Sequence, residues 1–266
     1  MTGTAELLDF MDDLADAAAR ETMRGFRAGL GVDNKAAAAG LGFDPVTAAD
    51  RGAEAAMTEL IAARFPGHRI LGEETGTSGG GDALEWVLDP IDGTRAYIAG
   101  LPTWGTLIGT RAEGAAVAGM MDQPYLRERY RGSRADGAVM RGPDGRDVAL
   151  QTAAKTALAD AFLTTTDPRL FDGEARTAAF ARVADAAKMT RFGLDCYGYA
   201  RLAAGGLDVV VESGLKAYDI VALIPIIEGA GGVVTDWSGE PAIDGGDVIA
   251  SANAGLHAQV LELLAS

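Results

Sequence analysis

The sequence is poor in the residues that form covalent crosslinks or bind soft metals. Its 266 residues include one cysteine, Cys196, and two histidines, His68 and His257. One cysteine excludes an intrachain disulfide and suits a reducing compartment, so we expect a cytoplasmic protein. Zinc sites are built mainly from cysteine and histidine, and their scarcity argues against one. We expect Cys196 to be a small buried residue and both histidines to lie at the surface.

Long apolar runs and positive charge are also scarce. No window of about 20 apolar residues occurs and no basic leader precedes an apolar stretch, so we expect neither a membrane span nor a signal peptide. The 23 Lys and Arg residues against 38 Asp and Glu give a net charge of −15. This balance argues against a nucleic-acid partner. A phosphorylated substrate remains compatible with it, because bound metal ions can invert the local field.

The hydrophobic pattern changes along the chain. Helical spacing predicts helices over 4–30 and 47–65, with a mobile loop over 31–43 and a glycine-rich loop over 76–81. Alternation then predicts a run of strands, at 85–88, 104–111, 115–122, 127–132 and 137–140.

From about residue 150 strands and helices alternate, including one helix over 218–230. A run of strands followed by this alternation predicts an α/β fold, in which two sheets are layered with helices. We place a boundary near 148–155. It separates an N-terminal α+β region, 1–150, with a large antiparallel sheet, from a C-terminal α/β region, 151–266.

Acidic residues gather where predicted strands end. Asp89 and Asp92 lie three residues apart in "WVLDPIDGTRAYIAG", and "GEE" at 72–74 ends another strand. Two carboxylates this close repel each other unless a proton or a cation relieves the repulsion. Further acidic groups occur in "DPVTAAD" at 44–50 and at Asp219. Hard oxygen ligands favour Mg²⁺, or Mn²⁺, over zinc.

Structural roles compete with this interpretation. Thr47 and Asp50 have the spacing of a helix capping box, and Asp219 or Asp195 would serve as helix caps. Glu212 would equally be a charge at the edge of the core, paired with an arginine. Gly93 and Thr94, which follow Asp92, could also bind a ligand. Their amides would hold a phosphate if they open a helix.

Several motifs together resemble one enzyme family. "GEE", "WVLDPIDGT" and "YD" before "EGAGG" are similar to the inositol monophosphatase family of Mg²⁺-dependent phosphatases, from "DPVTAAD" to "IASANAG". "LDCYGYA" and "VVVESGLKAYD" are most similar to its histidinol-phosphate phosphatase branch. Ala217 stands where the branch usually has proline, and Asp167 where it tends to have serine. The resemblance implies an αβαβα sandwich of two sheets and a homodimer.

The resemblance also implies a ligand set for two or three Mg²⁺ ions. Glu73, Asp89 and the Ile91 carbonyl would hold the first metal. Asp89, Asp92 and Asp219 would hold the second, and a third, weaker ion would lie near Glu73.

Catalytic and phosphate-binding roles follow in the same way. Asp50, Thr94 and Glu73 would act in catalysis, with Asp50 and Thr94 orienting the attacking water. Asp92 and the amides of Gly93 and Thr94 would bind the phosphate.

Substrate recognition is expected from acidic groups beside the phosphate site. The substrate of that branch, histidinol phosphate, carries an amine and an imidazole. These groups would pair with Asp195 and Glu212, near Asp219, when they are cationic. Arg191 is a further candidate, for closing the pocket or for an interface.

We therefore expect a Mg²⁺-dependent phosphomonoesterase that converts L-histidinol phosphate to histidinol in histidine synthesis. The alternatives are an inositol- or sugar-phosphate phosphatase and, in another class, a binding partner in a larger assembly.

Overall fold

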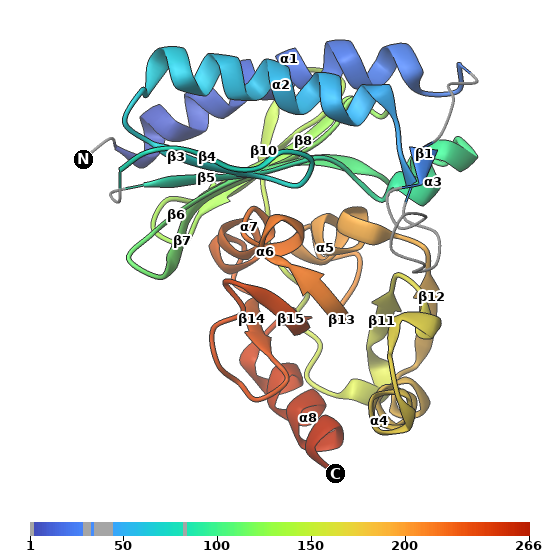
Figure 1. Cartoon of the computed structure of the whole chain (residues 1–266). Helices are drawn as coiled ribbons and strands as arrows, with labels where there is room; N and C mark the ends of the chain where they lie inside the picture. The colour runs from blue at the N-terminus through green and yellow to red at the C-terminus, as the bar shows by residue number, and fades with distance from the viewer. Residues whose placement is uncertain (1–2, 29–32, 35–44, 82–83) are drawn as a thin grey trace.

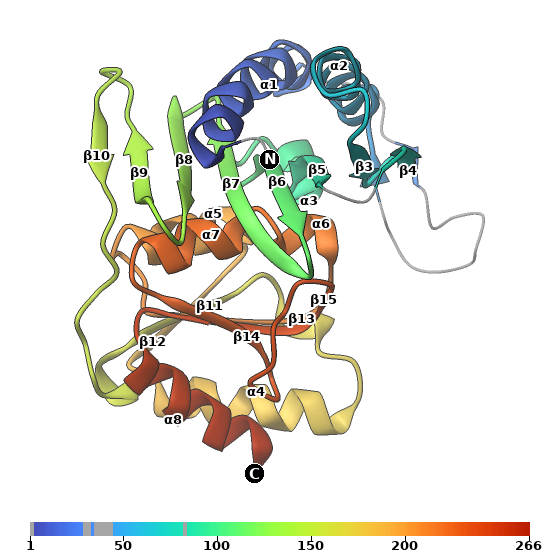
Figure 2. The ribbon, with the colours of Figure 1, turned by 90° about the vertical axis from the view of Figure 1, so that its left-hand side faces the viewer.

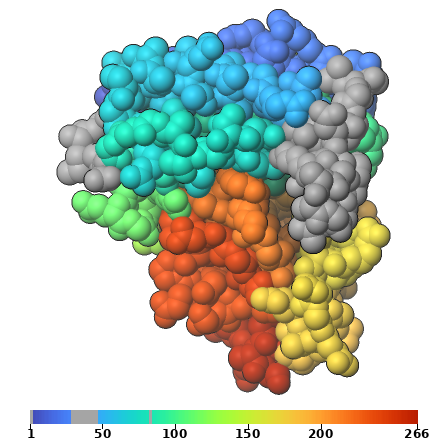
Figure 3. Space-filling model, in the orientation of Figure 1, coloured from blue at the N-terminus to red at the C-terminus, as the bar shows by residue number. Residues whose placement is uncertain are grey.

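The computed structural model describes residues 3–28, 33–34, 45–81 and 84–266, and the side chains of 33–34 and 45–46 lie outside the description. Its elements form an αβαβα sandwich (Figure 1), which a view turned by 90° displays layer by layer (Figure 2). The space-filling view shows the N-terminal helices at the top of the molecule and the C-terminal segments at the bottom (Figure 3). The predicted fold class is confirmed.

Helices α1 (Thr4–Gly25) and α2 (Ala48–Arg64) form the first layer. Their apolar residues recur every three or four positions, so each helix buries one face against the sheet. Leu7, Met11 and Met57 are fully buried in this layer. Helix α1 ends at Gly25, earlier than the predicted residue 30. Most of the predicted loop over 31–43 lies outside the described residues, but Asp33–Asn34 (β1) pairs with Pro45–Val46 (β2).

The large sheet has eight strands in the order β10-β9-β8-β7-β6-β5-β3-β4. Its interior strand β5 is buried along most of its length because helices cover both of its faces. A bulge between Asp89 and Asp92 interrupts the pairing of β5 with β6. The strands are β3 (Arg69–Gly72), β4 (Gly76–Gly79), β5 (Glu85–Asp92), β6 (Gly105–Ala112), β7 (Ala115–Gln123), β8 (Glu128–Ser133), β9 (Gly137–Arg141) and β10 (Asp147–Ala149).

The second sheet has five strands in the order β12-β11-β13-β15-β14. Helices α5, α6 and α7 lie between the two sheets, and α4 and α8 cover the outer face (Figure 2). These elements are β11 (Phe162–Thr165), α4 (Glu174–Ala186), β12 (Met189–Phe192), α5 (Asp195–Ala203), β13 (Val209–Lys216), α6 (Ala217–Ile220), α7 (Leu223–Gly229), β14 (Val233–Asp236), β15 (Gly245–Ser251) and α8 (Ala254–Ala265).

One hydrophobic cluster joins the two sheets through the middle helices. Leu107 and Tyr130 of the large sheet belong to the same buried cluster as Ile226 of α7 and Val248 of β15. The two sheets therefore share a core. None of the helices in the described ranges is long and apolar enough to cross a membrane.

Several predicted elements need correction. The predicted helix over 218–230 is two helices, α6 and α7, because Pro225 has no N–H to donate and its ring conflicts with the carbonyl four residues earlier. Part of the predicted glycine-rich loop forms the edge strand β4. Helix α3 (Thr94–Ala99) and strand β10 were not expected.

Candidate active site

The candidate site begins at the bulged end of β5. Asp89 is 1% exposed, and its Oδ1 accepts a hydrogen bond of 3.0 Å from the Ile91 N–H. The Thr106 hydroxyl donates to the Pro90 carbonyl at 2.8 Å, which ties the bulge to β6. A bulge re-aims side chains along a strand. It allows Asp89 and Asp92 to serve one site although they lie on either side of a proline.

Helix α3 starts directly after this bulge. Gly93 has φ +84°, a left-handed conformation that glycine adopts without a steric penalty. Thr94 is the first helical residue, so the N–H groups of the first turn have no acceptor within the helix. The Thr94 hydroxyl donates to the Ile91 carbonyl at 3.1 Å. The predicted phosphate-binding amides thus occupy a helix start.

Asp219 reaches the same place from α6. Its Oδ2 accepts a hydrogen bond of 2.6 Å from the Lys216 N–H, which fixes the carboxylate in the first turn of the helix. The expected N-cap is wrong in position, because Lys216 is the N-cap and Asp219 is the third helical residue, which bonds back to the backbone of the N-cap. One carboxylate oxygen from each of Asp89, Asp92 and Asp219 lies within 4.8 Å of the others. The fold therefore brings together three acidic residues that are as much as 130 residues apart in the sequence.

Asp50 and Glu73 complete the acidic cluster. The Thr47 N–H and hydroxyl donate to Asp50 Oδ2 at 2.8 and 2.5 Å, so the predicted capping box at the start of α2 is confirmed. The other oxygen, Oδ1, is buried and has no hydrogen-bond partner among the described atoms. The Glu73 N–H donates to the Leu88 carbonyl at 3.1 Å, which places Glu73 beside Asp89.

Burial and mutual repulsion shift the protonation of this cluster. Burial raises the pKa of Asp89 well above its usual range, and the charges of Glu73, Asp92 and Asp219 raise it further. Burial followed by the charges of Asp195 and Asp219 raises the pKa of Asp92 in the same direction. The pKa of Asp219 is raised to about 7, chiefly by burial. Carboxylates in such a cluster bind either protons or a cation.

The donor set fits a hard divalent cation. The cluster offers carboxylate oxygens and no sulfur or imidazole ligand among the three grouped residues. Asp50, whose pKa is raised by burial and slightly by the charge of Glu73, has a buried Oδ1 without a partner among the described atoms, which a metal-bound water would satisfy. Mg²⁺ and Mn²⁺ prefer oxygen ligands and keep several waters. The acidic cluster is therefore suited to such an ion.

A pocket of about 330 Å³ opens beside the cluster. Four carboxylates and one guanidinium, that of Arg95, are among its described lining residues. The lining residues are Asp92, Gly93, Thr94, Arg95, Thr166, Leu170, Asp195, Glu212, Ser213, Gly214, Leu215 and Asp219. Asp195 and Glu212 thus form an acidic wall of a pocket that Asp92, Asp219 and the start of α3 also line.

Asp195 lies at the start of α5 in a strained conformation. Its φ is +48°, in the left-handed region that few residues other than glycine adopt. Burial raises the pKa of Asp195 to about 6, against the opposing charge of Arg95. Strain of this kind is kept where the surroundings require it, and it concentrates at functional sites.

Glu212 forms the second part of the acidic wall. It is 2% exposed on β13 and accepts hydrogen bonds from the Thr166 N–H at 2.6 Å and from the hydroxyls of Thr166 and Thr165 at 2.9 and 3.1 Å. Burial raises its pKa to about 7. Its partners are threonines, in contrast to the arginine of the structural alternative.

The expectations for the other predicted residues have different outcomes. Arg191 is exposed on the edge strand β12 and is not among the described residues that line the pocket, so its role stays a prediction. Cys196 is buried, as expected. His257 is not at the surface, because it is 5% exposed and contacts Thr235 and Ser251. His68 is half-buried and accepts from the Trp86 indole N–H at 3.1 Å.

Two charged residues of the site were not predicted. Arg95 lines the pocket directly after Thr94, and the "DGTR" spelling of the motif would have indicated it. Glu54 is fully buried behind the turn that carries Glu73. Its position four residues after Asp50, on the same face of a helix, would have indicated its proximity.

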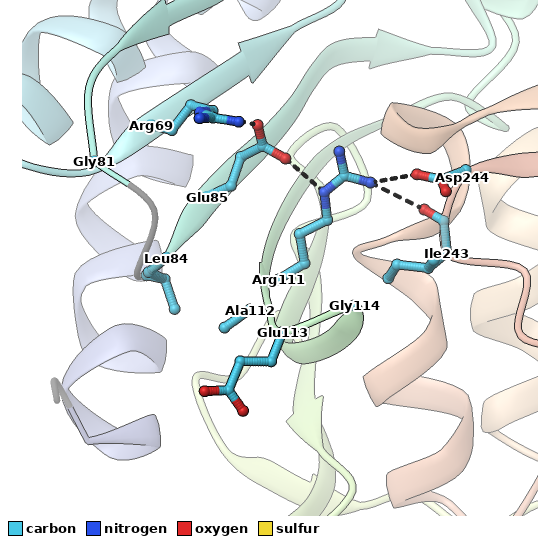
Figure 4. A pocket seen from close by; sticks show the side chains of 10 residues that line it. All are labelled: Arg69, Gly81, Leu84, Glu85, Arg111, Ala112, Glu113, Gly114, Ile243 and Asp244. Carbon is cyan, nitrogen blue, oxygen red and sulfur yellow. Dashed lines mark hydrogen bonds and ion pairs between the residues drawn. The ribbon is translucent and has the colours of Figure 1, made fainter.

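A second pocket, of about 370 Å³, lies at the opposite end of β5 (Figure 4). Arg111 donates to Glu85 at 2.5 Å and to Asp244 at 2.8 Å, and Arg69 lies 4.0 Å from Glu85. These charges satisfy one another across the junction between β6 and the loop before β15. The carboxylates that could hold a metal ion lie instead at the Asp89 end of the strand.

The αβαβα sandwich with its buried acidic site defines a phosphatase of a metal-dependent class. The chain belongs to the inositol monophosphatase family, whose model matches residues 4–266. The predicted family is thereby confirmed. Enzymes of this family act on small phosphate substrates.

Three similar proteins illustrate the range of relatives. The chain is 40% identical over 262 residues to the bifunctional phosphatase IMPL2, chloroplastic, of Arabidopsis thaliana, covering 94% of this chain and 72% of that protein. It is 36% identical over 209 residues to a histidinol-phosphatase of Chlorobaculum parvum, covering 79% of each. The solved structure of an inositol monophosphatase from Zymomonas mobilis is 36% identical, with a TM-score of 0.86 over 100% of both chains.

Proposed function

We propose that this phosphatase is a Mg²⁺-dependent histidinol-phosphatase, which hydrolyses L-histidinol phosphate to L-histidinol and phosphate. The observation that carries the proposal is the composition of the pocket beside the acidic cluster. Asp195 and Glu212 line it together with Asp92 and Asp219, and Arg95 is the one cationic side chain among its described lining residues. This wall suits a substrate with a cationic end.

Metal binding is assigned to the acidic cluster. Glu73, Asp89 and the Ile91 carbonyl would hold one Mg²⁺, and Asp89, Asp92 and Asp219 would hold a second. Bound Mg²⁺ would lower the pKa of water and neutralise charge on the phosphate and the leaving oxygen. Mn²⁺ offers the same preference for oxygen ligands.

The remaining site residues orient water and phosphate. Asp50 Oδ1, which is buried and lacks a partner among the described atoms, would accept a hydrogen bond from the attacking water. The Thr94 hydroxyl would donate or accept at the same water. The N–H groups of Gly93 and Thr94, at the start of α3, would donate to phosphate oxygens, as helix starts do.

The acidic wall would select the substrate. Histidinol phosphate carries an ammonium and an imidazole, and a carboxylate binds either of them through charge-assisted hydrogen bonds. Asp195 and Glu212 are assigned to this role, with Asp219 at the junction between the substrate and metal sites. Burial raises their pKa values to about 6 and about 7, and a cation beside them would lower these values and stabilise the charged form.

A phosphatase acting on inositol 1-phosphate is the second candidate. The similar structure from Zymomonas mobilis is named an inositol monophosphatase, and the acidic cluster suits either phosphate ester. Inositol offers hydroxyl groups and no cation, so it would gain less from two buried carboxylates.

A substrate panel separates the two candidates. Release of inorganic phosphate is measured from L-histidinol phosphate and from inositol 1-phosphate, each with Mg²⁺ and with EDTA. We expect a higher kcat/KM for histidinol phosphate and loss of both activities in EDTA. A clear preference for the inositol ester would replace the proposed substrate, and full activity in EDTA would refute the metal dependence.

The proposal extends to the organisation of the chain. We infer a homodimer, with regions 1–150 and 151–266 around the shared core. Met189 and Phe192 are 40% and 51% exposed on opposite faces of the edge strand β12, which also carries Arg191, and a second copy that pairs with this edge would cover apolar side chains. Light scattering after size exclusion would give the mass. A monomer at micromolar concentration would contradict the dimer.

A further inference from the structure

A buried carboxylate outside the acidic cluster supports the turn that carries Glu73. Glu54 lies on α2 and is 0% exposed. Its Oε2 accepts from the Glu74 N–H at 2.8 Å, and its Oε1 accepts from the Thr75 N–H at 2.9 Å and from the Thr75 hydroxyl at 2.5 Å. Both oxygens of one side chain are therefore committed to two consecutive residues of the turn.

The fit between Glu54 and the turn is close. A Cβ atom at Gly72 would lie 2.3 Å from Glu54 Oε1 and 2.4 Å from its Cδ. Glycine at the end of β3 is thus required for the carboxylate to approach the backbone. The glycine of the "GEE" motif is explained by Glu54 and not by a ligand.

Glu73 is held on both of its flanks. Its own N–H donates to the Leu88 carbonyl of β5 at 3.1 Å, and the next N–H, of Glu74, donates to Glu54. Asp89 and Asp92 are positioned by a strand, and Asp219 by a helix start. Glu73 alone of the proposed ligands lies on a turn at the end of an outer strand pair. It has the greatest need of an anchor, because turns are less rigid than the elements they join.

The contact between Glu54 and the turn also fixes how far Glu73 lies from helix α2. Asp50 and Glu54 are four residues apart on α2, so they lie on one face, one turn from each other. We propose that Glu54 is a positioning residue, which fixes Glu73 relative to Asp50 and thereby sets the affinity of the proposed metal site. This inference rests on the proposed function, because it takes Glu73 as a metal ligand and Asp50 as the group that orients water.

Two variants test the positioning role of Glu54 by removing different hydrogen bonds between its side chain and the turn. In Glu54→Gln an amide NH₂ replaces one oxygen and faces a backbone N–H, so at least one hydrogen bond is lost in a side chain of the same shape. Thr75→Val removes only the hydroxyl bond, at an exposed position where folding is not at risk. Glu59→Gln is the matched control, because Glu59 is exposed on the same helix.

Binding of Mn²⁺ is measured by electron paramagnetic resonance without substrate, together with the unfolding temperature. We expect Glu54→Gln to weaken Mn²⁺ binding about tenfold, in the range found for residues that support metal ligands. Thr75→Val should weaken it less, and Glu59→Gln should leave it unchanged. High Mg²⁺ should restore much of the kcat of Glu54→Gln with little change in substrate KM.

The outcomes separate the inference from the proposed function. If the wild-type protein binds Mn²⁺ and both variants bind it equally well, Glu54 is only structural, even if the unfolding temperature falls. If the wild-type protein binds no Mn²⁺, the metal assignment of Glu73 fails, and the inference fails with it.

Discussion

The Cys196 N–H donates a hydrogen bond of 2.6 Å to Asp92 Oδ2 and so joins the start of α5 to the end of β5. The two residues are 104 positions apart in the sequence. Asp195, the neighbour of Cys196, lines the pocket beside the acidic cluster, to which Asp92 belongs. A Cβ atom on Gly93 would lie 3.0 Å from the Asp195 Cβ, so the two segments are also in direct contact. Movement of α5 would therefore be transmitted to both parts of the site.

Asp92→Asn should separate catalysis from folding. The amide oxygen can still accept from Cys196, so the contact between β5 and α5 is kept. The negative charge toward the metal is lost, and we expect kcat/KM to fall roughly 100-fold or more. Removing one charge from a repelling cluster should leave metal-free stability equal or higher. Phosphate release and urea unfolding in EDTA measure the two effects. Full activity of the variant would refute the metal role of Asp92.

Asp195→Asn should change substrate choice. Asparagine tolerates the left-handed φ of +48°, so the backbone at the start of α5 should be kept. Losing a charge-assisted hydrogen bond costs about 1.5–3 kcal/mol, which corresponds to a tenfold or larger rise in KM for histidinol phosphate. The KM for inositol 1-phosphate should change much less. An equal change for both esters would remove Asp195 from the recognition of the cationic end.

Gly119→Ala should destabilise the packing of the middle helices on the large sheet. A Cβ atom at Gly119 of β7 would lie 1.9 Å from the Ala222 carbonyl oxygen and 2.8 Å from Pro225. Such overpacking costs about 1–3 kcal/mol or more. At Gly67 a Cβ atom meets nothing within 4 Å, so Gly67→Ala is the matched control, and its effect should stay within about 0.5 kcal/mol. Equal urea midpoints for the two variants would contradict the close approach of β7 and the segment before α7.

His257 should make stability depend on pH. Its Nε2 lies 2.8 Å from the Thr235 hydroxyl, which donates to the Asp236 carbonyl, so Nε2 is the protonated nitrogen and Nδ1 accepts from Ser251 at 3.1 Å. Burial lowers the pKa of His257 below the usual 6.5. The unfolded state then binds the proton more readily, and stability present at neutral pH is lost as the pH falls below about 6.5.

The urea midpoint between pH 7.5 and 5.5 measures this loss. The raised pKa values of Asp195, Glu212 and Asp219 act in the opposite direction over this range, so the two proteins are compared with each other. His257→Gln has no titrating ring, so lowering the pH should reduce its midpoint less than that of the wild-type protein, or raise it more. An identical pH dependence in the two proteins would show that His257 does not contribute.

Local patterns predicted the elements better than their ends. Residues at helical spacing such as Leu7 and Met11 indicated α1, and alternation indicated most strands of the large sheet. The break between α6 and α7 depends on Pro225, which lies inside an apolar stretch whose spacing predicts a single helix. Strand β4 is glycine-rich and exposed, and it forms only because β3 offers a free edge to pair with.

The site was predictable where one short motif carries it. Asp89, Asp92 and Thr94 lie within one six-residue motif. The repulsion between the two aspartates indicated a cation, and the glycine and threonine that follow indicated a phosphate. The burial of His257 was missed because two hydroxyls from β14 and β15 satisfy its ring, and those contacts exist only in the folded chain. The same reason hid the hydrogen bond from Cys196 to Asp92.

Crystals grown with Mn²⁺ and inorganic phosphate would test the metal-centred mechanism most directly. We expect anomalous scattering peaks about 2.0–2.4 Å from carboxylate oxygens of Asp89, Asp92 and Asp219, with phosphate at the N–H groups of Gly93 and Thr94. A further peak is expected where Glu73 meets Asp89. Strong Mn²⁺ peaks elsewhere, with none at this cluster, would contradict the assignment of the acidic residues and the mechanism built on them.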